Sequence, residues 1–328
     1  MADTIPTRLL IISDTHGEDF DSNTRPQQRA DVVLHCGDLT DGSKLEEFHT
    51  ALNMLRSIDA PLKLIIPGNH DFTMDRDAFT TKVAEAKQPL NPELVAQEYG
   101  RVGQAQQLFD DSKDEGIVFL HEGTHQFTLN NGAMLTIYAS PYTPALGAWG
   151  FQYHPNHGRR FDIQGGTDIV MTHGPPKGIM DFTSSRERAG CTDLFAAVAQ
   201  ARPRVHCFGH IHEGWGAKLV TWKDSGINEP SRFTSIDNNN SSVIENLNTL
   251  KKIKFDSNDI VEEKQAKVEQ LRQHRCASTS HCAQDEYPLV AGSQTLFVNA
   301  AIMGDGDVVQ RPWLVDIELP KQGGNVGD

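Results

Sequence analysis

The sequence predicts an α/β fold in which short buried strands alternate with helices. Two observations predict it: apolar runs that are too short to be helices, and segments with helical spacing between them. Runs rich in Val, Ile or Leu are typical of strands buried on both faces of a sheet. They lie at 9–12, 32–34, 64–66, 169–171 and, in a less pure form, 205–208.

Two of the intervening segments are predicted as helices. In 44–57, apolar residues recur at helical spacing after Ser43, and Glu46 stands three residues beyond Ser43, as in a capping box. The range 192–201 is the second helix, and Pro203 follows its end.

Two further stretches have the pattern of antiparallel strands. The ranges 123–129 and 133–139 flank Asn130-Asn131-Gly132, which is a typical hairpin turn. Near the C-terminus, 296–300 and 314–319 are predicted as a second strand pair. The sheet is therefore expected to be mixed.

The range from about 224 to 290 breaks the α/β pattern because it is polar and rich in Asn, Ser and charged residues. We interpret it as an insertion, largely loop or disordered, in one domain that spans 1–328. Within it, 261–274 has the character of a solvated helix. Cys276, His281 and Cys282 offer zinc-binding side chains, but their spacing matches no usual template, which favours a disordered tract.

Charge and composition restrict the class of partner. Lys and Arg number 30 against 44 Asp and Glu, a formal net charge of −14, so we expect neither a nucleic-acid polymer nor an anionic membrane as partner. No apolar run is long enough to span a bilayer, and the first residues do not have the pattern of a signal peptide. The five cysteines form no Cys-x-x-Cys pair, which favours free thiols in the cytoplasm or another reducing intracellular compartment, with Cys36 and Cys207 in the core.

Each of the five apolar runs ends at a turn that carries Gly together with Asp, Asn or His. Because ligands bind outside the carboxyl ends of strands in α/β sheets, these polar side chains are expected to share one crevice. That many buried polar groups need a compensating charge, and divalent metal ions supply it most simply. The residues in these turns are Asp14, His16, Asp38, Asn69, His70, Asp71, His173, His210 and His212.

Each turn taken alone has a plain structural interpretation. Asp14 can cap the following turn, Gly37-Asp38 is a common turn sequence, and a single histidine such as His173 is often only a buried hydrogen-bonding group. Recurrence of the same pattern at five strand ends favours a metal site. The mixture of nitrogen and oxygen ligands without thiolate suits manganese, iron or zinc.

These five turns, in this order, resemble the signature of the calcineurin-like metallophosphoesterases over about residues 8–223. The stretches 172–176, 188–191 and 209–214 are more similar to the metallophosphoesterase-domain-containing subgroup of animals and fungi. The resemblance implies a single metallophosphoesterase domain, built as a four-layer α/β/β/α sandwich of two mixed β-sheets, with the insertion at about 224–290. It also implies a cofactor of two divalent or trivalent transition-metal ions per chain.

The resemblance also implies a role for each residue. The first metal ion would be bound by Asp14, His16 and His212, and the second by Asn69, His173 and His210. Asp38 would bridge the two ions, because a carboxylate spans a pair of cations. His70 would be the catalytic residue that stabilises the transition state or protonates the leaving oxygen. Asp71 would orient His70 or cap the helix that follows, and we favour the cap.

The implied function is hydrolysis of a phosphate-ester substrate by attack of a metal-bound hydroxide. We expect first a phosphodiesterase for small phosphodiesters such as cyclic nucleotides. The alternatives are a Ser/Thr phosphoprotein phosphatase and a metal-binding interaction scaffold with little activity, although the intact His70 favours an enzyme. For substrate contacts, the basic loop 154–160 and the aromatic residues Trp149 and Phe151 are candidates, each with a plain structural alternative.

Overall fold

The computed structural model describes residues 3–224, 230–304 and 310–322, and its strands fall into two large sheets and one small one. The first sheet contains β1 (Thr4–Ile12), β2 (Val32–His35), β3 (Leu62–Ile65), β4 (Ile117–Phe119), β13 (Ala277–Ser280) and β15 (Trp313–Pro320). The second contains β5 (Gly123–Thr128), β6 (Met134–Ser140), β9 (Ile169–Thr172), β10 (Val205–Phe208), β11 (Gly216–Trp222), β12 (Ile236–Asn246) and β14 (Gln294–Asn299). The small sheet pairs β7 (Thr143–Pro144) with β8 (Gln152–Tyr153).

Helices connect these strands. The α-helices are α1 (Leu45–Arg56), α2 (Arg76–Ala84), α3 (Pro92–Tyr99), α4 (Gln104–Asp110), α5 (Thr192–Ala201) and α6 (Asn258–His274). The 3-10 helices are η1 (Phe72–Met74), η2 (Lys113–Glu115), η3 (Pro155–His157), η4 (His212–Gly214) and η5 (Leu247–Thr249). No helix among the described residues has both the length and the apolar content needed to cross a membrane.

Both large sheets are mixed. Within the described residues, the strand order is β13-β15-β1-β2-β3-β4 in the first sheet and β12-β11-β14-β10-β9-β6-β5 in the second. Strands β1, β2, β3 and β4 run parallel, whereas β15 is antiparallel to β1. In the second sheet, β10 is parallel to both β9 and β14.

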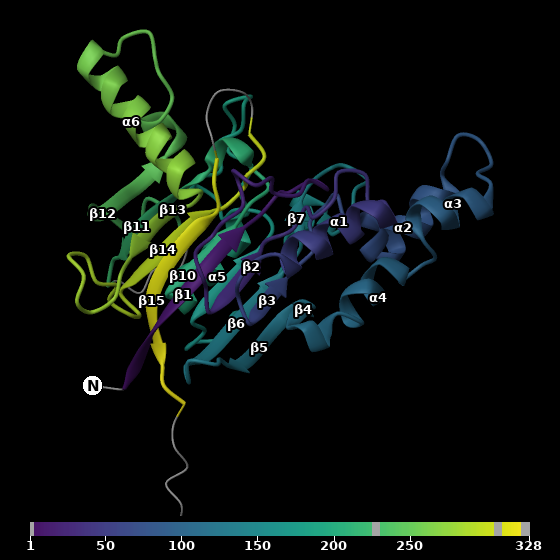
Figure 1. Cartoon of the computed structure of the whole chain (residues 1–328), viewed down its shortest axis with the longest axis horizontal. Helices are drawn as coiled ribbons and strands as arrows, with labels where there is room; N and C mark the ends of the chain where they lie inside the picture. Colours follow the sequence, from purple (N-terminus) through teal and green to yellow (C-terminus); the bar gives the residue numbers. More distant parts are fainter. Residues whose placement is uncertain (1–2, 225–229, 305–309, 323–328) are drawn as a thin grey trace, which may run out of the picture.

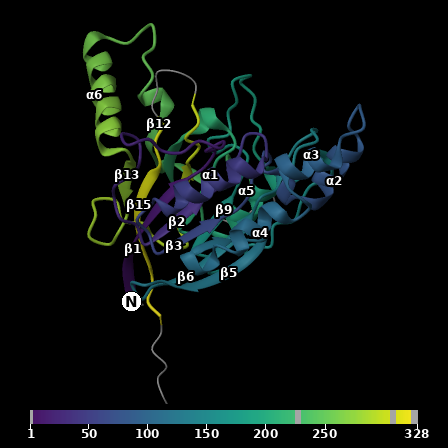
Figure 2. The same ribbon diagram turned by 45° about the vertical axis from the view of Figure 1, so that its right-hand side comes forward.

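Side-chain alternation along the strands produces four layers (Figure 1). In β1, Leu9 and Ile11 join the core between the two sheets, whereas Leu10 and Ile12 face outward and pack with α1 and α4. Figure 2 shows α1 and α4 along the outer side of the first sheet. The outer face of the second sheet packs against α5, with Phe208 among its contacts. The predicted α/β/β/α sandwich is therefore confirmed.

The predicted local elements are present, with one shift at a helix start. The helix at 192–201 and the hairpin around Asn131 both form where the sequence predicts them. The first helix begins at Leu45, one residue later than expected, with Lys44 as its N-cap. Glu47, rather than Glu46, accepts the backbone N–H of Lys44 at 2.8 Å, because the turn before the helix includes Ser43 with a φ of 60°.

The prediction of a strand pair near the C-terminus is wrong, although both strands exist. β14 lies in the second sheet between β10 and β11, and β15 lies in the first sheet between β13 and β1. Both strands instead contribute to the core between the sheets, where Leu296 and Val315 belong to the same apolar cluster. Their alternating patterns indicate two strands but do not determine which sheet each one joins.

The segment interpreted as an insertion contains regular structure in its described part. β12 pairs antiparallel with β11, and β13 pairs parallel with β15, so the segment extends both sheets at one edge. Leu247 and Leu250 enter the core between the sheets, whereas α6 has no fully buried residue. Figures 1 and 2 show α6 at the end of the molecule opposite to α3. The division into one domain with an insertion stays a prediction.

Two buried histidines lie in the central strands, and each has its Nε2 beside a threonine hydroxyl. His206 Nε2 lies 2.9 Å from the Thr172 hydroxyl, which donates to the Gly174 carbonyl, so Nε2 carries the proton. Its Nδ1 has no hydrogen-bond partner among the described residues. Burial lowers the pKa of His206 to about 3. His35 is tied to Thr15 in the same way, at 3.1 Å.

We predict that the neutral His206 makes stability fall in mild acid. The unfolded chain takes up a proton at this residue below a pKa of 6.5, whereas the folded chain does so only near 3. The free energy of unfolding should therefore drop as pH falls through that interval, by up to ~1.4 kcal/mol per pH unit from this residue. Urea unfolding of the metal-free protein at several pH values between these limits measures the slope.

His206→Gln keeps a donor for Thr172 but cannot titrate, so its slope should be smaller than that of the wild type. His49→Gln, at an exposed position on α1, is the matched control and should leave the slope unchanged. If both variants showed the wild-type dependence of unfolding free energy on pH, His206 would not be its source.

Candidate metal centre

The five turns that follow β1, β2, β3, β9 and β10 meet at one end of the two sheets. Three of these strands belong to the first sheet and two belong to the second, so the site lies between the sheets rather than within one. Each turn contributes at least one side chain to the cluster of candidate ligands. The structure brings together Asp14, His16, Asp38, Asn69, His70, His173, His210 and His212.

One group of potential ligands contains Asp14, His16 and His212. Each offers one ligand atom, and these atoms all lie within 4.8 Å of one another. His212 Nε2 is 3.3 Å from Asp14 Oδ1, and the rings of His16 and His212 are 5.3 Å apart. This is the set that the sequence assigns to the first ion.

A second group contains Asp38, His173 and His210, with the same limit of 4.8 Å between their ligand atoms. His173 Nε2 lies 3.3 Å from Asp38 Oδ2 and 3.0 Å from Asn69 Oδ1, which adds Asn69 to the group. Asp38 also lies close to His16, with 3.9 Å between its Oδ2 and the ring Nε2. The Asp38 carboxylate is thus shared between the two groups.

The backbone at this site adopts an uncommon conformation. Asp14, His16, Asp38 and His210 have φ values of 57°, 46°, 51° and 66°, in the left-handed region. Residues other than glycine rarely adopt it, although Asp and His tolerate it better than most. Such strain is concentrated at functional sites, where the surrounding structure holds it. Here it occurs in three of the five turns, those after β1, β2 and β10.

Two glycines allow the carboxylates to approach the opposite loops. A Cβ on Gly68 would lie 2.2 Å from Asp38 Oδ1, and a Cβ on Gly209 would lie 2.0 Å from Asp14 Oδ2. The backbone N–H groups that follow them bind the carboxylates: His70 donates to Asp38 at 2.8 Å, and His210 donates to Asp14 at 3.0 Å. Asp14 therefore links the first sheet to the second.

The donor set fits a bound cation. His173 donates its Nδ1–H to the Cys36 carbonyl at 2.9 Å, which leaves Nε2 as the atom that faces the oxygens of Asp38 and Asn69. Burial lowers the pKa of His173, but the charge of Asp38 outweighs it and raises the pKa to about 9, so the cluster attracts positive charge. His16 Nε2 is buried and has no hydrogen-bond partner among the described residues. A ligand nitrogen without a partner is what a metal ion satisfies.

His70 is only partly buried, with 25% of its side chain exposed, compared with 33% for His212 and 9% for His16. Its Nδ1 lies 2.6 Å from the Asp41 carbonyl oxygen and therefore donates to it. The Asp41 carboxylate is 3.7 Å from the same nitrogen and 3.5 Å from His16 Nδ1. His70 also lies within ligand distance of His16 and Asp38, so distance alone does not separate an acid from a ligand. Asp41 has no distinguishing sequence signal and was missed.

Asp71 has neither of the roles expected from the sequence. Its side chain makes no capping hydrogen bond to η1. Instead it is fully buried and accepts the backbone N–H groups of Leu39, Thr40 and Gly68, at 3.1, 2.9 and 2.8 Å. Asp71 thus joins the turn after β2 to the turn after β3, which positions Asp38 beside Asn69.

An aromatic side chain covers one side of His70. The Trp149 ring stacks on His70 with 4.3 Å between centroids and an interplanar angle of 28°. Its segment is fixed to the β3 turn, because Gly150 donates to the Asn69 carbonyl at 3.0 Å and Phe151 to Asp75 at 2.8 Å. Phe151 is buried, so of the two aromatic candidates only Trp149 is accessible, with 40% exposed.

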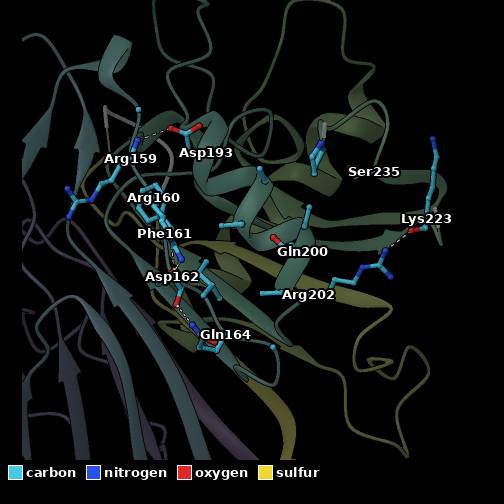
Figure 3. Close-up of a pocket in the computed structure, with 18 of the residues that line it drawn as sticks. Arg159, Arg160, Phe161, Asp162, Gln164, Asp193, Gln200, Arg202, Lys223 and Ser235 are labelled. Carbon is cyan, nitrogen blue, oxygen red and sulfur yellow. Dashed lines mark hydrogen bonds and ion pairs between the residues drawn. The ribbon is translucent and has the colours of Figure 1, made fainter. Parts of the chain in front are cut away.

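A separate hollow lies elsewhere and contains none of the predicted ligands (Figure 3). This groove of about 1470 Å³ runs between the segment 157–165 and α5. Its cationic side chains have partners: Arg160 pairs with Asp162, and Arg202 donates to the Lys223 carbonyl. Arg159, from the basic loop 154–160, pairs with Glu122 and covers the Tyr142 ring at 3.5 Å. The metal cluster is therefore the better candidate for chemistry.

The alternative zinc site in the insertion is not formed in the structure. His281 uses Nδ1 on the Tyr287 carbonyl and Nε2 on the Thr279 hydroxyl, at 2.8 and 2.9 Å. Cys276 is buried against Gln28. In the described part of the chain, the groups able to hold a metal ion do not include these residues.

Comparison with known families agrees with this arrangement of ligands. The family model described as calcineurin-like phosphoesterase matches residues 7–214. The chain belongs to this family. The match includes every candidate ligand and His70, and the family is a class of phosphoester hydrolases.

The sequence of this calcineurin-like phosphoesterase aligns with curated relatives over about two thirds of its length. It is 32% identical over 219 residues to metallophosphoesterase domain-containing protein 1 of Homo sapiens, covering 64% of this chain and 62% of that protein. It is 30% identical over 219 residues to the probable rhamnogalacturonate lyase C of Emericella nidulans, covering 66% of this chain and 18% of that protein. The match thus spans less than two thirds of either relative. The crystal structure of TT1561 of Thermus thermophilus aligns with a TM-score of 0.39 and 13% identity, over 66% of this chain and 84% of that one.

We predict that Asp38→Ala weakens metal binding at both positions, because its carboxylate is shared between the two groups. The wild type should carry about two transition-metal ions per chain. Asp14→Ala should mainly affect the ion held with His16 and His212. Elemental analysis of the purified proteins, before and after incubation with Mn²⁺, measures the occupancy.

Asp168→Asn is the control, since it neutralises a buried carboxylate that pairs with Arg204 away from the site. It should keep the wild-type metal content. Wild-type protein that binds no metal under any of these conditions would exclude the dinuclear site.

Proposed function

We propose that the chain is a dinuclear-metal hydrolase of phosphate esters and acts on small phosphodiesters such as cyclic nucleotides. The observation that carries the proposal is the pair of ligand groups that share Asp38, with His70 at their edge. The ions would be manganese, iron or zinc, because the ligands are imidazole, carboxylate and amide.

In this proposal, Asp14, His16 and His212 hold one ion, Asn69, His173 and His210 hold the other, and Asp38 bridges them. When bound, the two ions would activate water and neutralise charge on the phosphate. The protein holds the ligands in place through the Cys36 carbonyl, which orients His173, and through the N–H groups that bind Asp14 and Asp38.

His70 is proposed to act on the leaving oxygen. The Asp41 carbonyl holds its Nδ1 proton, which leaves Nε2 as the atom that can carry or release a proton toward the substrate. Trp149 limits rotation of the ring by stacking against it. Asp41 and Trp149 are therefore positioning residues for His70.

The walls of the site favour a small substrate over a phosphoprotein. On one side, the segment that carries Trp149 is tied to Asn69. On the other, Ser184 donates to Glu213 at 2.9 Å, which places the 182–188 turn beside His212. A phosphoprotein phosphatase needs an open groove at the metals, and we propose that these two flanking segments hinder the approach of a protein substrate.

We also propose a cellular compartment for the protein. All five cysteines are free thiols, and all but Cys282 are buried. This supports a reducing, cytoplasmic environment, in which such thiols persist.

We predict that the metal-loaded protein hydrolyses bis-p-nitrophenyl phosphate and cyclic nucleotides faster than p-nitrophenyl phosphate or a phosphoserine peptide. The flanking segments should disfavour the phosphopeptide, and the comparison with p-nitrophenyl phosphate tests the proposed preference for diesters over monoesters. Initial rates across these four substrates, with Mn²⁺, Fe²⁺ or Zn²⁺ added in turn, make the comparison. Preference for the phosphopeptide would support the phosphatase alternative, and no turnover with metals bound would support the scaffold.

His70→Ala should keep both metal ions and lose rate in a way that depends on the leaving group. An alkyl phosphodiester needs a proton on its leaving oxygen and should lose roughly 10²–10⁴-fold in kcat. A p-nitrophenyl ester leaves without a proton and should lose much less. The two kcat values, with metal content determined in parallel, measure this difference.

His210→Ala is the matched control, since loss of a ligand should deplete metal and slow both esters alike. Equal losses and depleted metal in His70→Ala would instead assign His70 as a ligand.

A further inference from the structure

Lys82 lies one aromatic ring away from His70 of the candidate metal centre and has no acidic partner among the described residues. It belongs to the last turn of α2, and its Nζ lies 4.7 Å from the ring centroids of both Phe72 and Trp149. Among the described residues, no carboxylate pairs with this ammonium group. Burial lowers the pKa of Lys82, and no nearby carboxylate opposes that shift.

The position of Lys82 relates it directly to the proposed acid. The Trp149 ring that it contacts is also the ring stacked on His70, so one indole separates the ammonium group from His70. Phe72 packs edge-on against the same indole, with 6.1 Å between centroids. The leaving group would lie on this side of the site, because His70 serves the leaving oxygen.

Two other described cations on this side of the molecule, Arg159 and Arg188, have acidic partners. Arg159 pairs with Glu122, and Arg188 pairs with the buried Asp181 at 2.5 Å. Cation–π contact alone does not neutralise Lys82, since aromatic faces carry no net charge. In a chain with a net charge of −14, an unpaired ammonium group at a site for anions gives a local attraction for negative charge.

We propose that Lys82 and Trp149 form a specificity subsite for phosphodiesters whose leaving group carries a further anionic substituent, such as a second phosphate. His70 and Lys82 occupy the faces of the indole, so its exposed edge contacts the body of the leaving group, and the ammonium group beyond it binds the additional charge. The inference rests on the proposed hydrolase function and adds to it the class of substrate that this site prefers.

The kinetic test uses two aryl methyl phosphate diesters that differ only at the para position of the leaving phenol. One carries a methyl group, and the other carries a phosphonomethyl group. Lys82→Gln should lower kcat/KM for the phosphonomethyl ester about fivefold, mainly through KM, and leave the methyl ester unchanged. Lys82→Arg should restore the preference because it restores the charge.

The matched control is Lys87→Gln, which makes the same change in net charge at an exposed position just beyond α2. It should leave both esters at wild-type rates. Raising the salt concentration should reduce the wild-type preference, as expected for a partly exposed charge pair. Equal effects of Lys82→Gln on the two esters, or none, would overturn the proposal.

A binding measurement separates failure of this inference from failure of the hydrolase proposal. Trp215, Trp222 and Trp313 are buried, whereas Trp149 is 40% exposed, so a ligand in the subsite should change the fluorescence of Trp149. Benzylphosphonate titrated into the metal-free protein should bind the wild type about fivefold more tightly than Lys82→Gln, and benzyl alcohol should bind both equally.

If neither ester is hydrolysed but benzylphosphonate shows this difference, the hydrolase proposal fails and the anion subsite stands. If benzylphosphonate binds both proteins equally, the subsite is overturned, whatever the activity.

Discussion

The structure depends on the burial of two carboxylates, Asp14 and Asp38, between its sheets. They are 0% and 2% exposed, and an isolated buried carboxylate is strongly unfavourable. The protein compensates with backbone N–H donors and with imidazoles from both sheets. Because Asp14 comes from the first sheet and binds the His210 N–H of the second, the same charge that can attract metal also fixes how the sheets meet.

This constraint explains the irregular backbone of the loops. Asp14, Asp38 and His210 adopt left-handed φ values, and Gly68 and Gly209 leave room for the carboxylates. The cost of such conformations is of order 1–3 kcal/mol each and must be offset by the contacts around them. The buried strands on either side supply a rigid frame, and Asp71 ties two of the loops together.

The side of the cluster that carries the ligands differs from the side around His70. The ligand turns follow strands and are held on several sides, whereas Trp149 and Lys82 near His70 come from segments that carry no ligand. Asp41 fixes one nitrogen of the ring, Trp149 covers its face, and Lys82 lies beyond the indole. The ligand turns suit metal binding, which this family shares. The residues around His70 would distinguish one substrate from another.

The sequence by itself determined the five buried strands whose ends carry the ligand turns, the hairpin around Asn131 and the helices near 45–56 and 192–201, because burial periodicity and Gly-Asp-His patterns are local. Tertiary structure decided that β14 and β15 lie in different sheets, since pairing depends on contacts between distant segments. It alone also revealed that Asp41, Trp149 and Lys82 surround His70, because they occupy separate loops and a helix with no shared motif. Local pattern therefore identified the chemical groups, and packing of distant segments determined their surroundings.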